Sequence, residues 1–148
     1  MHVRRLIVLA VVARLSQVPG VTAVKAGRAA PMPVASAPYL LVYARGEESR
    51  STTLDDDDAR RLQRDLVLAI DIVTASADDD DAATDALALE VEMAMAADTT
   101  LGGLVEDLEL RRTDLDARAE GETRTGRARL EYLVAYHTSV TRPDQALP

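Results

Sequence analysis

Two runs of four consecutive aspartates, residues 55–58 and 78–81, are the densest groups of ligating side chains in the sequence. Calcium-binding loops space their carboxylates as D-x-[DN]-x-[DN]-G with a distal glutamate, so that the chain can wrap around the ion. Neither run has this spacing. Consecutive aspartates at a helix start more often cap the helix and face the positive end of its dipole. We therefore expect solvated, capping charge, and binding of a divalent cation stays an open alternative.

The side chains that nucleophilic or metal-assisted catalysis requires are scarce. The 148 residues include no cysteine and two histidines, His2 and His137, which stand far apart in the sequence. A disulfide framework, a thiolate nucleophile and a Cys-ligated metal are thereby excluded, and a His-based zinc site has too few ligands. No glycine-rich phosphate loop, G-x-S-x-G or H-E-x-x-H motif occurs. We expect no cofactor and no metal site, with His137 an exposed strand residue, and a small α+β enzyme with a pocket built on His137 and nearby carboxylates stays an open alternative.

The charge of the chain is acidic and unevenly placed. A net charge of −8 and a pI near 4.7 disfavour sequence-nonspecific binding of DNA by the whole surface. Residues 1–50 hold seven basic and two acidic side chains, whereas residues 51–148 hold ten basic and twenty-three acidic ones. Such a division suits head-to-tail association between copies of the chain, although chance is the alternative explanation.

The length and composition are those of one ordinary globular domain. Because the chain has no Phe or Trp and 47% hydrophobic residues, its core must be built from Leu, Val, Ile and Ala. We expect a single domain over residues 1–140 and a mobile C-terminal tail over residues 141–148, which contains two prolines.

The apolar N-terminal run has two possible meanings. Residues 6–13 follow Arg4 and Arg5 and resemble the hydrophobic region of a short secretory signal. Arg14 interrupts the run, however, and Pro19-Gly20 is a typical helix stop. The pattern favours a core helix over residues 3–17. The alternative is a small secreted binding domain with an N-terminal signal peptide, and the run is too short to span a membrane.

The pattern of apolar residues further along predicts a strand that is covered on both sides. Over residues 39–46, Tyr39, Leu41 and Tyr43 fall on one face, and the other face is also apolar. We expect helices to cover one face and another subunit to cover the other. Gly46 should end this strand, and a long loop should follow over residues 47–59.

The remaining elements complete a two-layer sandwich. Their expected ranges are strands at 21–27, 60–74, 104–117 and 128–138, a helix at 80–97 and a polar hairpin tip at 120–126. A register change is expected near Arg111 and Arg112. The predicted fold is α+β, with a mostly antiparallel mixed sheet of four to five strands packed against two helices.

Several local strings, in their order and spacing, resemble the tail terminators of long-tailed bacteriophages and gene transfer agents, also called tail-completion or minor tail proteins. The strings are Val18-Pro-Gly-Val21, Pro38-Tyr-Leu-Leu-Val-Tyr-Ala-Arg-Gly-Glu-Glu48, Leu66-Val-Leu-Ala-Ile, Ala86-Leu-Ala-Leu-Glu-Val-Glu-Met-Ala-Met-Ala-Ala-Asp98, Thr100-Leu-Gly-Gly103 and Ala128-Arg-Leu-Glu-Tyr-Leu-Val-Ala-Tyr136. The resemblance covers nearly the whole chain. The apolar run at residues 6–13 and the aspartate runs depart from it, which leaves open a host-specific role at either end of an assembly.

The resemblance implies a structural virion protein of the tail or neck, assembled in the host cytoplasm, and no enzyme. Members of this family form a hexameric ring on the last ring of the tail tube. The ring stops tube polymerisation and presents the surface to which the head-side connector or stopper protein docks. The implied partners are further copies of the chain, the tail tube protein and that connector, with DNA only passing through the lumen and no membrane.

The same resemblance suggests which residues meet other subunits. We expect the loop 47–59 and the hairpin tip 120–126 to reach neighbouring rings, with Arg45 and Arg50 pairing with acids of an adjacent subunit. The candidate subunit or ring interface residues are Tyr39, Leu41, Tyr43, Arg45, Glu47, Glu48, Arg50, Asp55, Asp56, Glu122 and Arg124.

Overall fold

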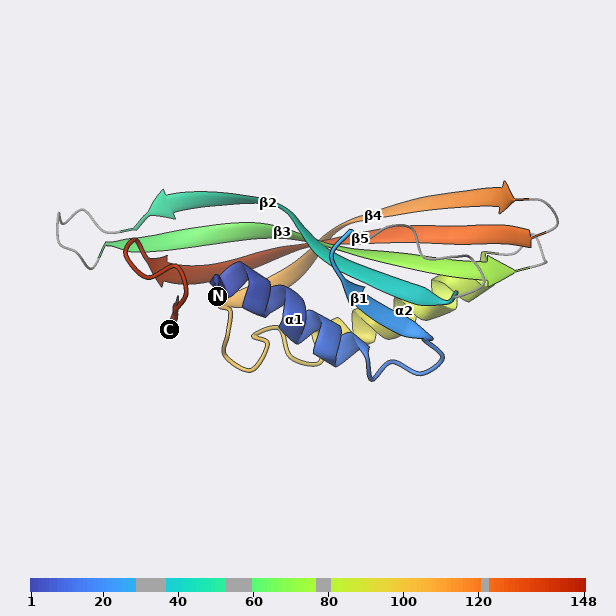
Figure 1. The fold of residues 1–148 in the computed structure, drawn as a ribbon, viewed down its shortest axis with the longest axis horizontal. Helices are drawn as coiled ribbons and strands as arrows, with labels where there is room; N and C mark the ends of the chain where they lie inside the picture. The colour runs from blue at the N-terminus through green and yellow to red at the C-terminus, as the bar shows by residue number, and fades with distance from the viewer. Residues whose placement is uncertain (29–36, 53–59, 77–80, 121–122) are drawn as a thin grey trace.

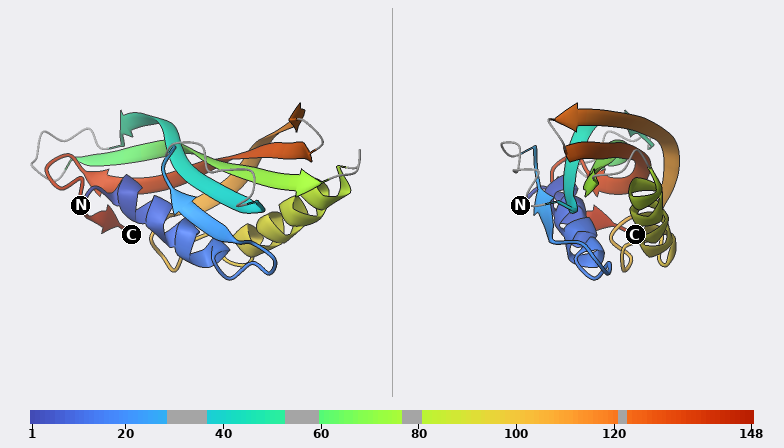
Figure 2. Two further views of the ribbon diagram at one scale, coloured as in Figure 1. Left: turned by 45° about the vertical axis from the view of Figure 1, so that its right-hand side comes forward. Right: turned by 90° about the vertical axis from the view of Figure 1, so that its right-hand side faces the viewer.

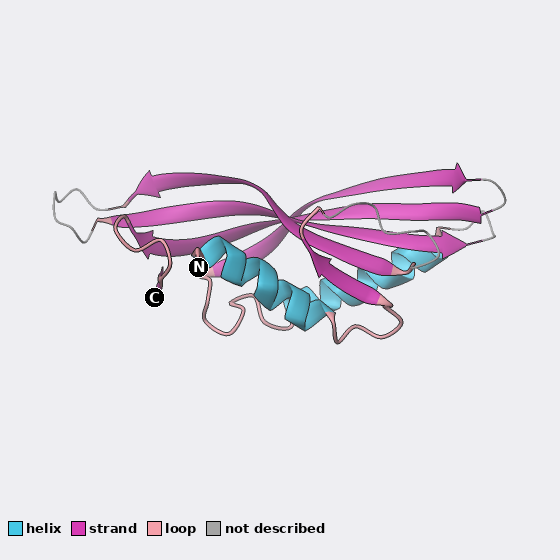
Figure 3. Cartoon of the chain, in the orientation of Figure 1, coloured by secondary structure: helices cyan, strands magenta, loops and turns pink. Residues whose placement is uncertain are grey.

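Two helices lie on one face of a six-stranded, mostly antiparallel sheet (Figures 1 and 3). The computed structural model describes residues 1–28, 37–52, 60–76, 81–120 and 123–148. In chain order the elements are α1 (Val3–Leu15), β1 (Ala23–Ala26), β2 (Tyr39–Ser51), β3 (Arg61–Ser76), α2 (Ala82–Ala96), β4 (Asp107–Glu120), β5 (Thr123–Ser139) and β6 (Ala146–Leu147). This arrangement confirms the predicted α+β class.

The strand order of the sheet is β1-β2-β3-β5-β4, and β6 pairs with the end of β5. The pair β1–β2 is parallel, and every other pair is antiparallel. The central strands β3 and β5 stay in one register from the pair Arg61–Ser139 to the pair Ser76–Arg124. This long uninterrupted ladder is what the period-two pattern of both segments predicts.

Two β-bulges lie opposite each other on the strands that flank this central pair. In β2 the register shifts between Ala44 and Gly46, and in β4 it shifts between Leu110 and Arg112. Ala44 and Leu110 both belong to the cross-strand row that contains Leu68 and Tyr132. Bulges increase the local right-handed twist, and the strands cross in projection near the middle of the sheet in Figure 1.

The core lies between the helices and the inner face of the sheet. Figure 2 shows the two helices beneath a sheet that curls around them. From α1, the side chains of Val3, Ile7, Val11 and Leu15 are completely buried. They pack with aliphatic side chains of β2, β3 and β5 in one cluster. Residues 3–15 therefore form a core helix, as the sequence favours.

Helix α2 begins in close contact with the sheet, and a glycine makes this possible. The hydroxyls of Thr74 in β3 and Thr84 in α2 are buried and lie 2.7 Å apart. A Cβ added to Gly126 of β5 would be 2.2 Å from the Thr84 hydroxyl and 2.5 Å from that of Thr74. Any larger residue at position 126 would therefore have to displace these two hydroxyls and break the hydrogen bond between them, or move the start of α2 away from the sheet.

The turn after α2 ties the two helices together. The carboxylate of Asp98 accepts hydrogen bonds from the hydroxyl of Thr100 (2.6 Å) and from the backbone N–H groups of Thr100 (2.9 Å) and Gly102 (2.7 Å). These bonds lower the pKa of Asp98 to about 2. Arg14 of α1 donates to the backbone oxygen and to the carboxylate of Asp98. Gly102 and Gly103, in the turn that follows α2, have positive φ, a conformation that glycine adopts without strain.

Several predicted boundaries differ from the structure: β4 begins at Asp107 and not at residue 104, and three further differences concern the candidate interface. Gly46 does not end β2. The chain forms a bulge between Ala44 and Gly46, and residues 47–51 continue the pairing with β3. The loop predicted for residues 47–59 therefore begins later, and residues 53–59 lie outside the described part of the chain. The hairpin tip predicted for residues 120–126 is also wrong in extent, since Glu120 pairs with Thr123.

The C-terminal segment contacts both the sheet and the first helix. Leu147 of β6 pairs with His137, and the backbone oxygen of Pro143 accepts a hydrogen bond from the N–H of Val3 (3.1 Å). The mobility expected for residues 141–148 stays a prediction.

Candidate assembly interface

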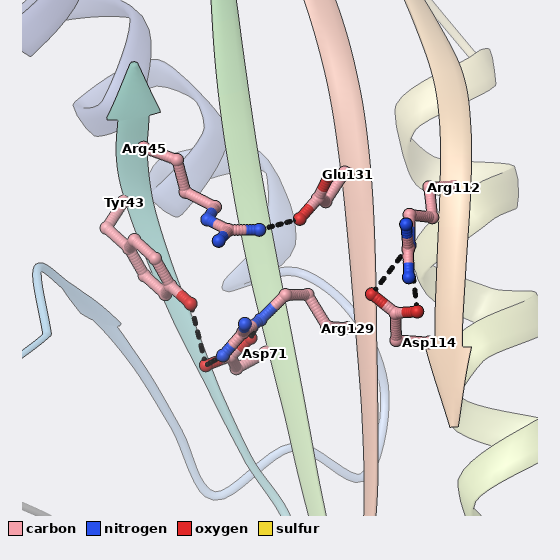
Figure 4. Close-up of polar contacts among 7 residues, drawn as sticks. All are labelled: Tyr43, Arg45, Asp71, Arg112, Asp114, Arg129 and Glu131. Atoms are coloured by element: carbon pink, nitrogen blue, oxygen red, sulfur yellow. Dashed lines mark hydrogen bonds and ion pairs between the residues drawn. The ribbon is translucent and has the colours of Figure 1, made fainter. Parts of the chain in front are cut away.

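The face of the sheet that points away from the helices carries an ordered set of polar side chains. We call this surface the open face and define it by the seven residues that Figure 4 draws: Tyr43, Arg45, Asp71, Arg112, Asp114, Arg129 and Glu131. They come from the four long strands β2, β3, β5 and β4. The alternation of side chains along each strand, shifted by one at the bulges of β2 and β4, places them on the side opposite the apolar core residues.

Asp71 connects three of these strands. Its carboxylate accepts two hydrogen bonds from the guanidinium of Arg129, at 2.7 and 3.2 Å. It accepts a third from the hydroxyl of Tyr43, at 3.0 Å. Asp71 and Arg129 are direct cross-strand partners in the β3–β5 register. The bidentate bond to Asp71 raises the pKa of Arg129 above its ordinary value, so its guanidinium stays charged.

Two further ion pairs continue the pattern across the sheet. Arg45 is the residue that the β2 bulge leaves without a partner, and its guanidinium reaches over β3 to contact Glu131 of β5. The β3 residue in that row is the small, buried Ala69, which leaves room for the arginine side chain. On β4, Arg112 donates to both oxygens of Asp114, at 2.8 and 3.0 Å.

The charges of the open face cancel. It holds three arginines and three acids, and each arginine contacts an acid of the same surface (Figure 4). These three ion pairs are neutral, whereas Arg28 and Arg127, which line hollows on the same side of the sheet, add positive charge. The surface is suited to polar contacts with another protein, because arginine and tyrosine are enriched in protein interfaces.

Tyr43 is the aromatic centre of this surface. The guanidinium carbon of Arg28 lies 4.7 Å from the centre of its ring, and that of Arg129 lies 5.9 Å away, both within cation–π range. Burial raises the pKa of Tyr43, and the charge and hydrogen bond of Asp71 raise it further. The phenol therefore keeps its proton to a higher pH than an ordinary tyrosine does.

Two adjoining hollows of about 330 and 320 Å³ open on this side of the sheet. Both are lined by Asp71, Val73, Arg127 and Arg129. Their volumes are at the low end of small-molecule pockets, which are usually mostly apolar. Here the lining is largely charged, and Asp71 and Arg129 already bind each other, so the hollows are better suited to side chains of a neighbouring protein.

Glu47 lies on the opposite face, beneath the start of α1. Its side chain is 8% exposed and contacts the guanidinium of Arg64 at 2.8 Å and that of Arg4 at 3.3 Å. The hydroxyl of Tyr136 also donates to it. Burial and this carboxylate raise the pKa of Tyr136. The bulge at Ala44 and Gly46 explains the position, because it reverses which residues of β2 face the helices.

The structure places the other candidate interface residues as follows. Tyr39 and Tyr43 are buried and Leu41 is half-buried. Glu48 and Arg50 are exposed near the end of β2, and the guanidinium of Arg50 bonds Gln63 and lies 3.8 Å from Asp65. Arg45 and Arg50 thus both have acidic contacts within their own chain. Asp55, Asp56 and Glu122 lie outside the described residues, and only the backbone of Arg124 is described, in β5.

Other chemistry finds no support in the described residues. His137 lies on β5 with its Nδ1 atom 3.5 Å from a carboxylate oxygen of Glu106. No group of three or more His, Cys, Asp or Glu side chains in the described ranges could hold a metal ion. Of the aspartate run at 78–81, only Asp81 is described, and it precedes α2 without a side-chain capping bond. Neither described helix is long and apolar enough to cross a membrane.

The sequence did not indicate the acids and bases of the open face beyond Arg45. Asp71 and Arg129 are visible as polar residues within apolar strands. Which of them become neighbours depends on the β3–β5 register, and this register is set by residues far apart in the chain. The sequence did show that Asp71 and Arg129 occupy outward positions on two different strands, and this was the only indication that they could pair.

Comparison with known proteins finds matches among solved structures alone. No protein-family model and no curated protein sequence matches the chain. A chain in the structure "Virion of native gene transfer agent (GTA) particle" is similar at a TM-score of 0.38 and 17% sequence identity. The similarity covers 86% of this chain and 92% of that chain.

Proposed function

We propose that this chain is a tail-terminator subunit of a phage-like virion. In this proposal, copies of the chain form a closed ring, hexameric by the resemblance, that caps the tail tube and ends its polymerisation. The same ring joins the tail to the head-side connector. The observation that carries the proposal is that the strings resembling tail terminators fall on successive elements of one fold. Residues 38–48 lie on β2, residues 66–70 on β3, residues 86–98 on α2 and the turn after it, and residues 128–136 on β5.

The extended hairpin of β2 and β3 supports an assembly role. The two strands stay paired as far as Ser51 and Leu62, and in Figure 1 this end of the sheet projects beyond the N-terminal end of α1. Glu48 and Arg50 are exposed on it. A rigid, paired hairpin can contact a neighbouring ring without the loss of conformational entropy that ordering a flexible loop would require.

The acidic surface fits a ring through which DNA passes. With a net charge of −8 per chain, a ring of several copies repels the phosphate backbone at short range. DNA would therefore slide through the lumen without being retained.

The secreted-domain alternative conflicts with the position of α1. Cleavage near Val24 or Ala26 would remove a helix whose Val3, Ile7 and Leu15 side chains are completely buried. It would also cut within β1 (Ala23–Ala26). The remaining chain would expose the apolar inner face of β2 to water.

The decisive experiment is size-exclusion chromatography with light scattering on the full-length chain, followed by negative-stain imaging with and without purified tail tubes. We expect closed rings in solution, or a monomer that forms a ring at tube ends and stops their elongation. A monomer that leaves tube length unchanged at every concentration would contradict the proposal.

A further inference from the structure

The outer side of α2 carries an apolar stripe that nothing in the described chain covers. Leu89 and Met93, one turn apart, are 58% and 60% exposed, and the exposed Ala86 and Ala97 extend the same stripe. Leu115 of β4 is 69% exposed. Its cross-strand partner Ala128 belongs to the core, so Leu115 faces the same side of the sheet as the helices. Exposed apolar side chains grouped along one side of a helix, as Leu89 and Met93 are, mark a contact surface.

Acids border this stripe on both sides. Asp85 and Glu92 flank it on one side and Glu90 on the other, at the angular positions that 3.6 residues per turn gives them. Helix α2 contains no basic residue. Within the described residues none of these three acids forms an ion pair. The surface is therefore apolar at its centre and negative at its border.

The outer side of α1 has the complementary character. Arg5, Leu9 and Ala13 are exposed at intervals of four residues and so share one stripe. Helix α1 contains three arginines and no acid, and Arg5 has no ion-pair partner among the described residues. This surface joins a positive charge to an apolar side chain, opposite in sign to the border of the α2 stripe.

We propose that the α2 stripe binds the outer side of α1 of a second copy of the chain. Leu9 would pack between Leu89 and Met93, and Arg5 would lie against the acidic border. The alanines on both helices permit an interaxial distance of roughly 8–10 Å. Helices of 13 and 15 residues give matched contact lengths of about 20 Å.

Charge selects this pairing over the symmetric one. Two α2 stripes packed together would bring Asp85, Glu90 and Glu92 of one copy close to the same acids of the other. Like charges held in one interface are unfavourable. A contact between two different patches is heterologous, and repeated contacts of this kind form a ring where the rotation between copies closes. The inference rests on the proposed ring and assigns one contact within it.

Two double variants test the contact. The α1 variant is Arg5→Gln with Leu9→Gln, and the α2 variant is Leu89→Gln with Met93→Gln. All four positions are exposed and glutamine is a good helix former, so both variants should keep the wild-type circular dichroism spectrum and melting temperature. Val140→Gln, at another exposed apolar position outside both helices, is the matched control.

Self-association is measured by sedimentation over a concentration series and by ring formation at tube ends. We expect each variant to weaken the association constant by about tenfold or more, with the control unchanged. An equimolar mixture of the two variants retains one intact contact per pair of chains, so it should form 1:1 pairs and no closed ring. Added salt should weaken wild-type association.

The possible results distinguish failure of the proposed α1–α2 contact from failure of the proposed ring function. If the α1 variant assembles like the wild type, the inference is overturned and the ring function stands. If only the α2 variant fails and mixing restores nothing, α2 binds something other than α1, which also overturns the inference. If the wild type never associates, alone or on tubes, both the inference and the proposed function fail.

Discussion

At the scale of single residues, Asp71 is the acid on which the open face depends. It is the shared acceptor for Arg129 and Tyr43 and thereby connects β2, β3 and β5. An acid in the middle of an apolar strand would be costly without such partners. The register of the sheet supplies both of them.

Replacing Asp71 by Asn removes the charge and keeps the shape. We expect Asp71→Asn to lower the free energy of unfolding by about 1 kcal/mol, since the charge-assisted bonds are partly screened by solvent. Asp114→Asn, in the more exposed pair with Arg112, should change it by less than about 0.5 kcal/mol. Urea denaturation at pH 7 measures both, and equal effects would contradict the central role of Asp71.

Tyr132 should make the stability of the fold fall at alkaline pH. Burial, with a smaller contribution from Glu92, raises its pKa from 10 to about 12. In the unfolded chain the phenol ionises from pH 10, whereas in the fold it keeps its proton until about pH 12. Its contribution to stability is therefore complete below pH 10 and is lost as the pH rises towards 12.

We expect Tyr132→Phe to unfold with a shallower pH dependence between pH 10 and 12 than the wild type. By linkage, the difference in slope should be about 1.4 kcal/mol per pH unit. Tyr132 makes no hydrogen bond in the described chain, so the two proteins should be similar at pH 7. Urea unfolding at a series of pH values measures this, and parallel curves would rule out Tyr132 as the source.

At the scale of elements, much of the fold could be predicted, because it follows from periodicity. Residues 60–74 alternate with period two, and this segment is β3. The register change near Arg111 and Arg112 was visible as a break in the alternation of β4, and it is a bulge. The bulge of β2 was not predicted, because a glycine after an apolar run, as at Gly46, is also typical of the end of a strand. A bulge and a stop differ only in whether a partner strand continues, which is a tertiary property.

The candidate site was less predictable than the fold. The sequence singled out Tyr43 and Arg45, which do lie on the open face, and it also singled out Glu47, which the structure places under α1. Their neighbours Asp71, Arg129 and Glu131 come from β3 and β5. Contacts between strands depend on register, and hydrophobic periodicity fixes the face of a residue without fixing its partner.

Helix α1 should be indispensable to the fold. We expect a chain that lacks residues 1–22 to be unfolded, because five side chains of α1 are buried and each contributes about 1.5–3 kcal/mol. Their sum, about 7.5–15 kcal/mol, is comparable to the whole usual stability of a domain, about 5–15 kcal/mol. Circular dichroism and the dispersion of amide proton signals measure the result. A cooperatively folded truncated chain would reopen the secreted-domain alternative.

At the scale of the whole molecule, stacking between rings is the property that Arg45 and Arg50 should affect. Both lie on β2 and are exposed, and exposed ion pairs contribute about 0–1 kcal/mol to a fold. Arg45→Glu with Arg50→Glu should therefore leave the monomer folded and reduce the fraction of capped tubes. Arg142→Glu, in another exposed pair, is the matched control. Capping counted by electron microscopy at the wild-type level would exclude both arginines from the ring contact.

The acidic charge of the molecule predicts its behaviour towards DNA. Because the net charge is −8, we expect the purified protein to flow through a DNA column even at low salt. Retention at low salt that is lost on adding salt would indicate a basic lumen and contradict the sliding of DNA through an acidic one.

The paired bulges have a consequence for comparing this chain with its relatives. Arg45 and Arg111 are each the extra residue of a bulge, and beyond each of them the alternation of inward and outward side chains is shifted by one. Removal of the extra residue at position 45 or 111 would restore a regular strand and leave every later residue in its present pairing and on its present face. A regular strand that kept the extra residue would instead exchange the inner and outer faces from that point on, so that Glu47 would turn outward and Glu48 would lie beneath α1. In this fold, a strand without the bulge therefore keeps the same surface only if it is one residue shorter at that position.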